Sequence, residues 1–375
     1  MLKNYIKLAL KVLSRRKFFT FISLFGISFT LMVLMIIASF IETEFGENPP
    51  LTRNEDLVFI PSISMSYYAN DTVRDIDTLV NNGITKYDTT TQVKRQENAS
   101  TTNNSSISHR VLERYFTKLN SAEQTTFFAP QSTYDVYINN TKLTITTCIT
   151  DEGYWKVFDF VFKEGRPYND VEIKNGAQVV VVTQELGKKY FGSEANLLGK
   201  EIEMDDKHFK IIGVVATPTS SANYVCGDVY IPYTVYPEKG DPSDYFGGFM
   251  AVFLNKKNTD IKKLKKEILN RTDKIPILKP EEFNEIEMPA TTFSESYAQQ
   301  TLYNEDPEKS KRNLFLIMAS FIALFALLPV LNLINLNISR IMDRSSEIGV
   351  RKAFGANTRN ILFQFVFENI IQTFI

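Results

Sequence analysis

The chain has 375 residues and a formal net charge of −1, and 44% of its residues are apolar. A chain of this length has room for two or three domains, and its balanced charge gives no reason to expect a nucleic-acid partner. The average values hide a strong segregation of charged and apolar residues. Their distribution along the chain is therefore more informative than the overall composition.

The first 17 residues are strongly basic. They contain no acidic residue and six basic ones, Lys3, Lys7, Lys11, Arg15, Arg16 and Lys17. A helix over this segment would have an apolar face and a lysine-lined face, which favours a position in the headgroup layer of anionic membrane lipids. The alternative is a generic cationic flank that only sets the topology. We expect residues 1–17 to form a cytoplasmic amphipathic helix.

Residues 18–41 carry no charge and are rich in Phe, Leu, Ile and Met. As a helix this segment would be about 36 Å long, enough to cross a hydrocarbon core of roughly 30 Å. The alternative is a cleaved signal peptide, whose apolar core is shorter, at about 7–15 residues. We predict a first transmembrane helix that remains in the protein.

A second uncharged segment covers residues 313–339 and includes Pro329, which membrane helices tolerate. Between the two segments, residues 42–312 carry 40 acidic and 31 basic residues, a net charge of −9. Basic flanks mark the cytoplasmic side of a membrane protein. We therefore expect both ends of the chain in the cytoplasm and residues 42–312 on the far side of the membrane.

The acidic region contains both strand and helix patterns. Strands are expected at residues 179–182, 209–215 and 251–254, helices at residues 184–191 and 260–269, a hairpin at residues 134–149 that turns at Asn139–Asn140, and a surface loop at residues 85–108. Thr183 is placed to cap the first helix and Gly192 to end it. Because strands and helices do not alternate strictly, we predict an α+β domain.

Residues 340–358 after the second apolar segment are charged and contain good helix formers. Gly355 is suited to end a helix there, and Asn357 or Thr358 can cap a new helix that begins near Arg359. Residues 359–375 are apolar and stop at Ile375 without a polar flank. We interpret them as the start of a third transmembrane helix in a truncated chain.

Several segments resemble one family in the correct order. The sequence EIGVRKAFGA at residues 347–356, with QFVFE at residues 364–368, resembles the signature of FtsX-like ABC transporter permeases, in particular the MacB group. Residues 7–28 resemble the opening of the same family. The segments at residues 158–166, 179–192, 199–202 and 209–215 resemble a MacB-type periplasmic core domain.

The resemblance implies a multi-pass protein of the bacterial inner membrane. Its periplasmic domain would have two lobes, with an inserted lobe at about residues 150–245. A separate cytoplasmic ABC ATPase subunit would dock on residues 340–358, and a homodimer or a paired permease and a periplasmic adaptor are further expected partners. The implied docking residues are Arg340, Arg344, Glu347, Ile348, Arg351, Lys352 and Phe354. The alternative is a surface helix whose charges only contact water.

Two other functions fit the same segments. One is an FtsX-like regulator that controls cell-wall hydrolases instead of moving a substrate. The other is a two-span membrane sensor whose output domain lies beyond residue 375. Two further apolar spans would favour the permease, whereas an enzymatic domain would favour the sensor.

Residues typical of catalysis are sparse. His109 and His208 are isolated, without zinc-site spacing, and no Gly-x4-Gly-Lys-Ser/Thr motif occurs. We therefore expect no metal, no cofactor and no ATP hydrolysis by this chain itself. Cys148 and Cys226 both fall in the region expected outside, where they could form a disulfide, or each could be a small core residue.

Overall fold

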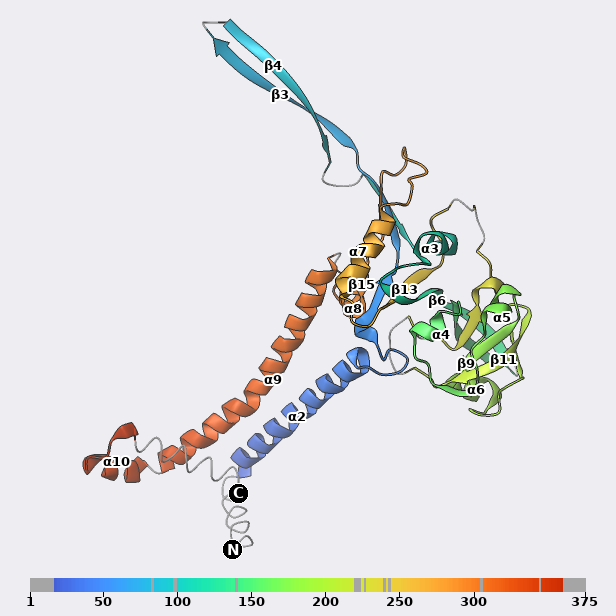
Figure 1. The fold of residues 1–375 in the computed structure, drawn as a ribbon. Coiled ribbons are helices and arrows are strands. Elements are labelled where there is room, and N and C mark those ends of the chain that lie inside the picture. The colour runs from blue at the N-terminus through green and yellow to red at the C-terminus, as the bar shows by residue number, and fades with distance from the viewer. Residues whose placement is uncertain are drawn as a thin grey trace. The chain divides into compact units, whose positions relative to one another are not determined.

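The structure is a computed structural model that describes residues 17–81, 84–96, 100–138, 141–218, 224–225, 227–238, 241, 244–303, 306–343 and 345–359. The chain divides into two compact units (Figure 1). The helical unit comprises residues 1–40 and 313–375, and the sheet unit comprises residues 41–312. The amphipathic helix expected at residues 1–17 lies outside the described residues, except for Lys17.

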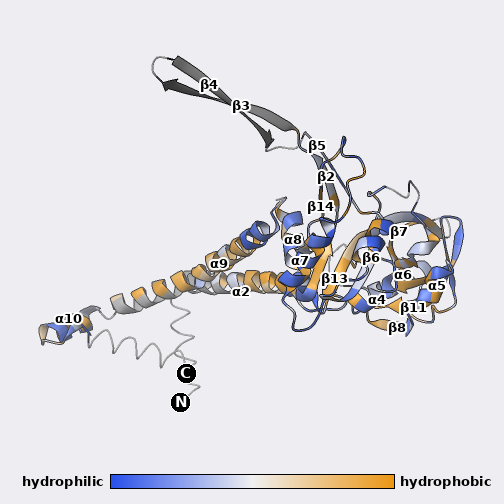
Figure 2. Ribbon diagram, turned by 45° about the horizontal axis from the view of Figure 1, so that its top comes forward, coloured by the Kyte–Doolittle hydropathy of each residue, from blue (hydrophilic) through white to orange (hydrophobic). Residues whose placement is uncertain are grey.

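The helical unit is built mainly from two long apolar helices, α2 (Lys17–Phe45) and α9 (Pro307–Asp343), and the short charged helix α10 (Ser345–Ala353). The end of α2 from Ile41 and the start of α9 up to Arg312 belong to the sheet unit. Ser28–Phe45 and Pro307–Leu331 are long and apolar enough to cross a membrane, judged by length and composition. Figure 2 shows the predominance of apolar residues on α2 and α9, and many of them are exposed, for example Met35 at 72%. Helix α9 continues through Pro329 without a break in its assignment.

The main element of the sheet unit is a ten-stranded sheet, counted over the described residues. Its order is β10-β11-β9-β12-β7-β6-β13-β1-β15, and β8 pairs with β11. The strands are β1 (Leu57–Ile60), β6 (Ala122–Ile138), β7 (Thr141–Thr150), β8 (Phe162–Gly165), β9 (Val179–Thr183), β10 (Glu201–Met204), β11 (Lys207–Val215), β12 (Val229–Pro232), β13 (Met250–Asn255) and β15 (Thr291–Thr292). The β11–β9 and β12–β7 pairs are parallel, and the other pairs are antiparallel.

Strand β6 lies between the two halves of this sheet and pairs with a strand of each. Its first half, up to Phe128, pairs with β13, and its second half, from Ala129, pairs with β7. The register shifts between Ala129 and Ser132, where the strand changes partner. The antiparallel strands of the hairpin predicted at residues 134–149 are confirmed, since β6 pairs with β7 as far as Ile138 and Thr141. The turn predicted at Asn139–Asn140 lies outside the described residues.

Two smaller sheets complete the unit. A three-stranded sheet has the order β14-β2-β5, with β2 (Ile63–Tyr67), β5 (Thr101–Ser105) and β14 (Glu285–Glu287). Strands β3 (Asn70–Asn81) and β4 (Ile84–Arg95) pair over twelve residues each. The surface loop predicted at residues 85–108 is therefore wrong. This segment holds most of β4 and all of β5, because its many threonines are β-branched residues that favour strands.

Short helices surround the main sheet. They are α3 (His109–Phe116), α4 (Tyr154–Val157), α5 (Asp170–Lys174), α6 (Gln184–Phe191), α7 (Ile261–Thr272) and α8 (Phe293–Leu302), with 3-10 turns η1 (Asn54–Asp56) and η2 (Tyr233–Val235). The predicted caps of α6 are confirmed, because the Thr183 side chain accepts a hydrogen bond from Leu186 N and Gly192 adopts a φ of +72°. Strand and helix elements mix as an α+β domain, as predicted.

Candidate functional site: the helix after the second apolar segment

Helix α10 carries most of the residues that we expected to bind an ATPase. It follows α9 after a single residue and contains no buried side chain. Glu347 and Lys352 are exposed, Ile348 and Arg351 are half-buried, and Phe354, just after the helix, is 88% exposed. The side chains of Ser345–Ala353 are therefore all at least partly accessible.

The charged residues of α10 form an intrahelical ion pair. Arg351 Nη2 lies 2.5 Å from Glu347 Oε1, one turn away. An exposed pair of this kind stabilises a helix by only about 0.3–0.5 kcal/mol. Its main consequence is to hold the guanidinium group against one face of the helix.

The end of α10 is defined by backbone geometry. Gly355 has a φ of +86°, Gly355 N donates to Lys352 O at 3.0 Å, and Ala356 N donates to Arg351 O at 3.0 Å. These two bonds form a Schellman motif, which satisfies the last carbonyl groups of a helix. The predicted role of Gly355 is confirmed.

A second helix begins directly after this stop. Asn357 Oδ1 accepts a hydrogen bond from Arg359 N at 3.1 Å, and Thr358 and Arg359 are helical. Of the two predicted caps, Asn357 makes this bond. Of residues 359–375, which we interpreted as the start of a third span, only Arg359 is described.

One residue of this surface was not predicted. Val350 is 57% exposed and lies one turn before Phe354, so the two apolar side chains share a face next to the Glu347–Arg351 pair. The four-residue spacing of Val350 and Phe354 in the sequence is the signal that could have identified it. The surface therefore combines an apolar pair with an ion pair, a combination suited to a protein contact.

Other predicted site residues are outside this surface or outside the described residues. Arg340 lies near the end of α9, in a part of the helix whose side chains are not described, and Arg344 lies outside the described residues. The same holds for the basic residues before Lys17. No group of three or more His, Cys, Asp or Glu side chains in the described part of the chain could hold a metal ion.

The two histidines, His109 and His208, lie in different environments. His109 is buried at the start of α3, where its ring stacks on Tyr233 at 4.2 Å and meets Phe249 at 5.0 Å. Burial lowers the pKa of His109, so the ring is neutral at physiological pH. His208 is exposed on β11, with Nδ1 3.9 Å from a Glu201 carboxylate oxygen.

The predicted cysteine pair is only partly described. Cys148 on β7 is 1% exposed, whereas Cys226 lies outside the described residues. A Cβ atom built on the neighbouring Gly227 would lie 3.2 Å from Cys148 Cβ, so the backbone next to Cys226 passes close to Cys148. The disulfide remains a prediction.

Two family models match this chain. The MacB-like periplasmic core domain family matches residues 20–271, and the FtsX-like permease C-terminal family matches residues 319–375. The chain belongs to the MacB-like periplasmic core domain family. The second match contains α10 and its Schellman stop, so the predicted docking segment lies within the FtsX-like region.

Curated relatives agree with this family. YvrN of Bacillus subtilis (strain 168), an uncharacterized ABC transporter permease, is 24% identical over 244 residues, which cover 60% of this chain and 53% of that protein. The macrolide export ATP-binding/permease protein MacB of Mannheimia succiniciproducens is 25% identical over 222 residues, which cover 59% of this chain and 32% of that protein. The chain thus spans about half of the first relative and a third of the second.

Two solved structures align with part of this chain. A domain of a putative permease from Porphyromonas gingivalis has a TM-score of 0.43 at 13% identity and covers 64% of this chain and 91% of that one. The periplasmic region of MacB from Actinobacillus actinomycetemcomitans has a TM-score of 0.37 at 18% identity, covering 52% and 81%.

Proposed function

We propose that this chain is the permease subunit of an ABC transporter of the MacB/FtsX type. A separate ATPase subunit hydrolyses ATP in the cytoplasm and docks on α10. The sheet unit lies outside the inner membrane and moves when the ATPase closes, either for export or to act on an external partner. The complex contains two permease chains, identical or paired, with one ATPase on each.

The observation that supports this proposal is the surface of α10 itself. A nine-residue helix with no buried side chain directly follows an apolar helix long enough to cross a membrane. Its apolar residues Val350 and Phe354 are exposed beside the Glu347–Arg351 pair. Exposed apolar residues bordered by charges are typical of protein contact surfaces.

The test is charge reversal on α10 in the chain purified with its native ATPase. We expect Arg351→Glu combined with Lys352→Glu to remove most of the ATPase from the purified complex, because the new carboxylates repel acidic partner groups and adjoin Glu347. The measurement is the ATPase-to-permease ratio by quantitative mass spectrometry, together with ATP turnover.

Two matched variants separate docking from helix stability. Lys262→Glu with Lys263→Glu places the same charge change on the exposed face of α7 and should leave the ratio unchanged. Glu347→Arg with Arg351→Glu keeps the intrahelical pair but reverses its direction, and we expect it to weaken docking as well. Full retention of the ATPase by the Arg351/Lys352 variant would refute the docking assignment.

A further inference from the structure

Helix α8 has an unusual buried surface. Three consecutive polar residues, Ser294, Glu295 and Ser296, are buried together with Phe293 and Ala298. The helix starts with a capping box, in which Thr292 Oγ1 accepts from Glu295 N and a Glu295 oxygen accepts from Thr292 N. Buried polar groups require hydrogen-bonding partners. Helix α8 contacts three other parts of the sheet unit, two of them through its polar groups and one through aromatic rings.

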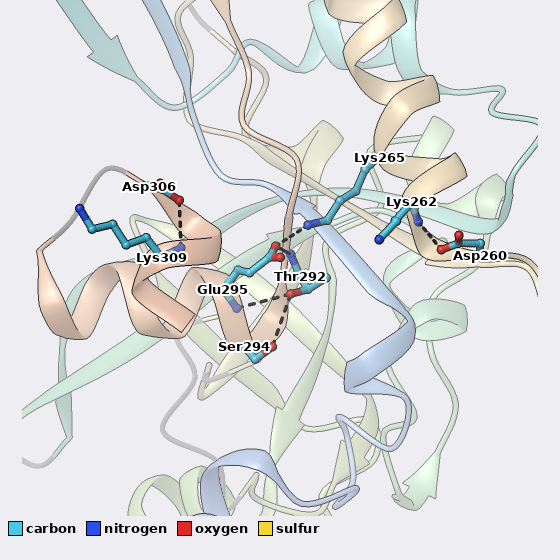
Figure 3. Close-up of polar contacts among 8 residues, drawn as sticks. All are labelled: Asp260, Lys262, Lys265, Thr292, Ser294, Glu295, Asp306 and Lys309. Atoms are coloured by element: carbon cyan, nitrogen blue, oxygen red, sulfur yellow. Dashed lines mark hydrogen bonds and ion pairs between the residues drawn. The ribbon is translucent and has the colours of Figure 1, made fainter. Parts of the chain in front are cut away.

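The first partner is α7. Lys265 Nζ donates to Glu295 Oε2 at 2.5 Å, and the two side chains are 20% and 8% exposed (Figure 3). Burial raises the pKa of Glu295, but the hydrogen bonds from Lys265 and Thr292 outweigh it and leave the pKa below its ordinary value. The pair is therefore ionised at neutral pH and fixes α8 to α7 with a short, mostly buried contact.

The second partner lies next to β12, in the other half of the main sheet from β15. Tyr224 lies in the segment between β11 and β12, and its hydroxyl group is 2.5 Å from Ser296 Oγ. Gln300 Nε2 donates to the same hydroxyl group at 2.8 Å. Tyr224 is 6% exposed, and the carbonyl oxygen of the next residue, Val225, accepts a hydrogen bond from the Tyr230 hydroxyl group of β12 at 2.8 Å. This is therefore a buried link from α8 to β12.

The third partner is the end of α2, the first apolar helix. The ring of Phe45 lies 5.0 Å from Tyr297 and 6.3 Å from Phe293. Asn54 Nδ2 also donates to Phe45 O at 2.9 Å, which fixes this last residue of α2. In the chain, α8 is also followed closely by α9, whose start is capped by Asp306 through a bond from Lys309 N at 2.9 Å (Figure 3).

We propose that α8 is the element that transmits movement from both apolar helices to the sheet unit, with Tyr224 and Lys265 as the positioning residues of the two links. This inference rests on the proposed function, because the movement is supplied by an ATPase. Helix α8 contacts the end of α2, precedes α9, and holds α7 and the β11–β12 segment by buried hydrogen bonds. Tyr224 transmits the movement toward β12, and Lys265 transmits it toward α7.

The test is hydrogen–deuterium exchange of the full chain with its ATPase in lipid nanodiscs, with and without MgATP and vanadate. In the wild type we expect nucleotide to change exchange in both α10 and β12. Tyr224→Phe should keep the change in α10 and reduce the change in β12 about fivefold, since both hydrogen bonds of the Tyr224 hydroxyl group, to Ser296 and Gln300, are lost. Tyr297→Phe removes a hydroxyl group from α8 that makes no hydrogen bond in the described part of the chain, so it should behave as wild type.

A second measurement without nucleotide is independent of the ATPase. Lys265→Met should increase exchange in α7, in α8 and, through α8, at residues 227–230, whereas the exposed Lys262→Met should not. Three results would overturn the inference. The first is a wild-type protein in which nucleotide changes exchange in α10 but not in β12. The others are a change in β12 that Tyr224→Phe does not reduce and an effect of Lys265→Met that is confined to α7. If nucleotide leaves wild-type α10 unchanged, the proposed function fails, and the nucleotide-free data alone decide whether α8 links these elements.

Discussion

Asp151 is a carboxylate enclosed at the point where β6 changes partner. It accepts hydrogen bonds from Thr126 Oγ1 at 2.6 Å, Phe127 N at 2.8 Å and Tyr154 N at 2.9 Å. Gly153 follows two residues later, and a Cβ atom built there would lie 2.1 Å from Thr125 O. Residues 151–153 therefore fit tightly against β6 and fix the start of α4.

The ionisation of Asp151 makes the stability of the sheet unit depend on pH. Burial raises the pKa of Asp151 to about 6 in spite of its three hydrogen bonds. The unfolded chain ionises this group near its ordinary value of 3.8, so the folded state holds the proton more tightly. The stabilisation of the folded state by this protonated group is therefore complete below pH 4 and is lost as the pH rises through 6.

We therefore expect Asp151→Asn to reduce the pH dependence of unfolding. Between pH 5 and pH 8 this carboxyl group should lower the free energy of unfolding of the wild type by about 1 kcal/mol, and the variant should not show this decrease. Thermal unfolding of the full chain in detergent across this pH range measures it. Asp206→Asn, in an exposed turn, is the control, and an equal pH slope in the Asp151 variant would contradict the expectation.

Among the elements, the β3–β4 hairpin is distinctive because it pairs only with itself in the described part of the chain. Two strands of twelve residues extend from Asn70 to Arg95, whereas an isolated two-stranded hairpin is only marginally stable in water. Its base is closed by a hydrogen bond from Gln96 N to Ala69 O at 2.9 Å. The hairpin therefore contributes little to the fold of the main sheet.

Replacing residues 70–95 by an Asn-Gly turn should consequently leave the sheet unit folded. We expect the midpoint of thermal unfolding to change by less than about 3 °C, because no strand of the main sheet loses a partner. As a comparison, Val136→Ala removes a buried side chain from the β6–β7 hairpin and should lower the midpoint. A large loss of stability in the deletion variant would show that the hairpin packs on the rest of the unit.

Local signals predicted some of these elements and failed for others. The strand at Val179–Val182, its following helix cap at Thr183 and the helix end at Gly192 were predicted correctly, because each depends on residues that are neighbours in the sequence. The residues of β4 and β5 were mistaken for a loop because threonine and asparagine also favour turns. The parallel pairing of β12 with β7 joins residues about 80 positions apart, so no local pattern could have revealed it.

The candidate site shows the same limit. Gly355 was identified as a helix stop because this role depends on its own backbone. Val350 was missed because its side chain matters only if it is exposed, and the sequence does not show which residues pack against α10. The partners of Glu295 and Tyr224 come from elements 30 and 72 residues away, so α8 could not be recognised as a junction from the sequence.

On the scale of the whole molecule, the charge pattern and the two units coincide. The acidic residues 42–312 nearly match the sheet unit, and the basic residues 1–17 belong to the helical unit. A net charge of −9 between the two apolar segments of the sequence and basic residues at their outer ends is the pattern expected from the positive-inside rule. The topology that follows, with both ends of the chain in the cytoplasm, can be tested directly.

Single cysteines on the two units should differ in their access to a membrane-impermeant maleimide. In a chain with Cys148→Ala and Cys226→Ala, Glu203→Cys occupies an exposed position on β10 and Ala353→Cys an exposed position on α10. We expect Glu203→Cys to be labelled in intact spheroplasts, and Ala353→Cys only after the membrane is permeabilised. Mass shift on a gel measures both. Labelling of the two positions from the same side would refute the topology, because the sheet unit and α10 would then face the same compartment.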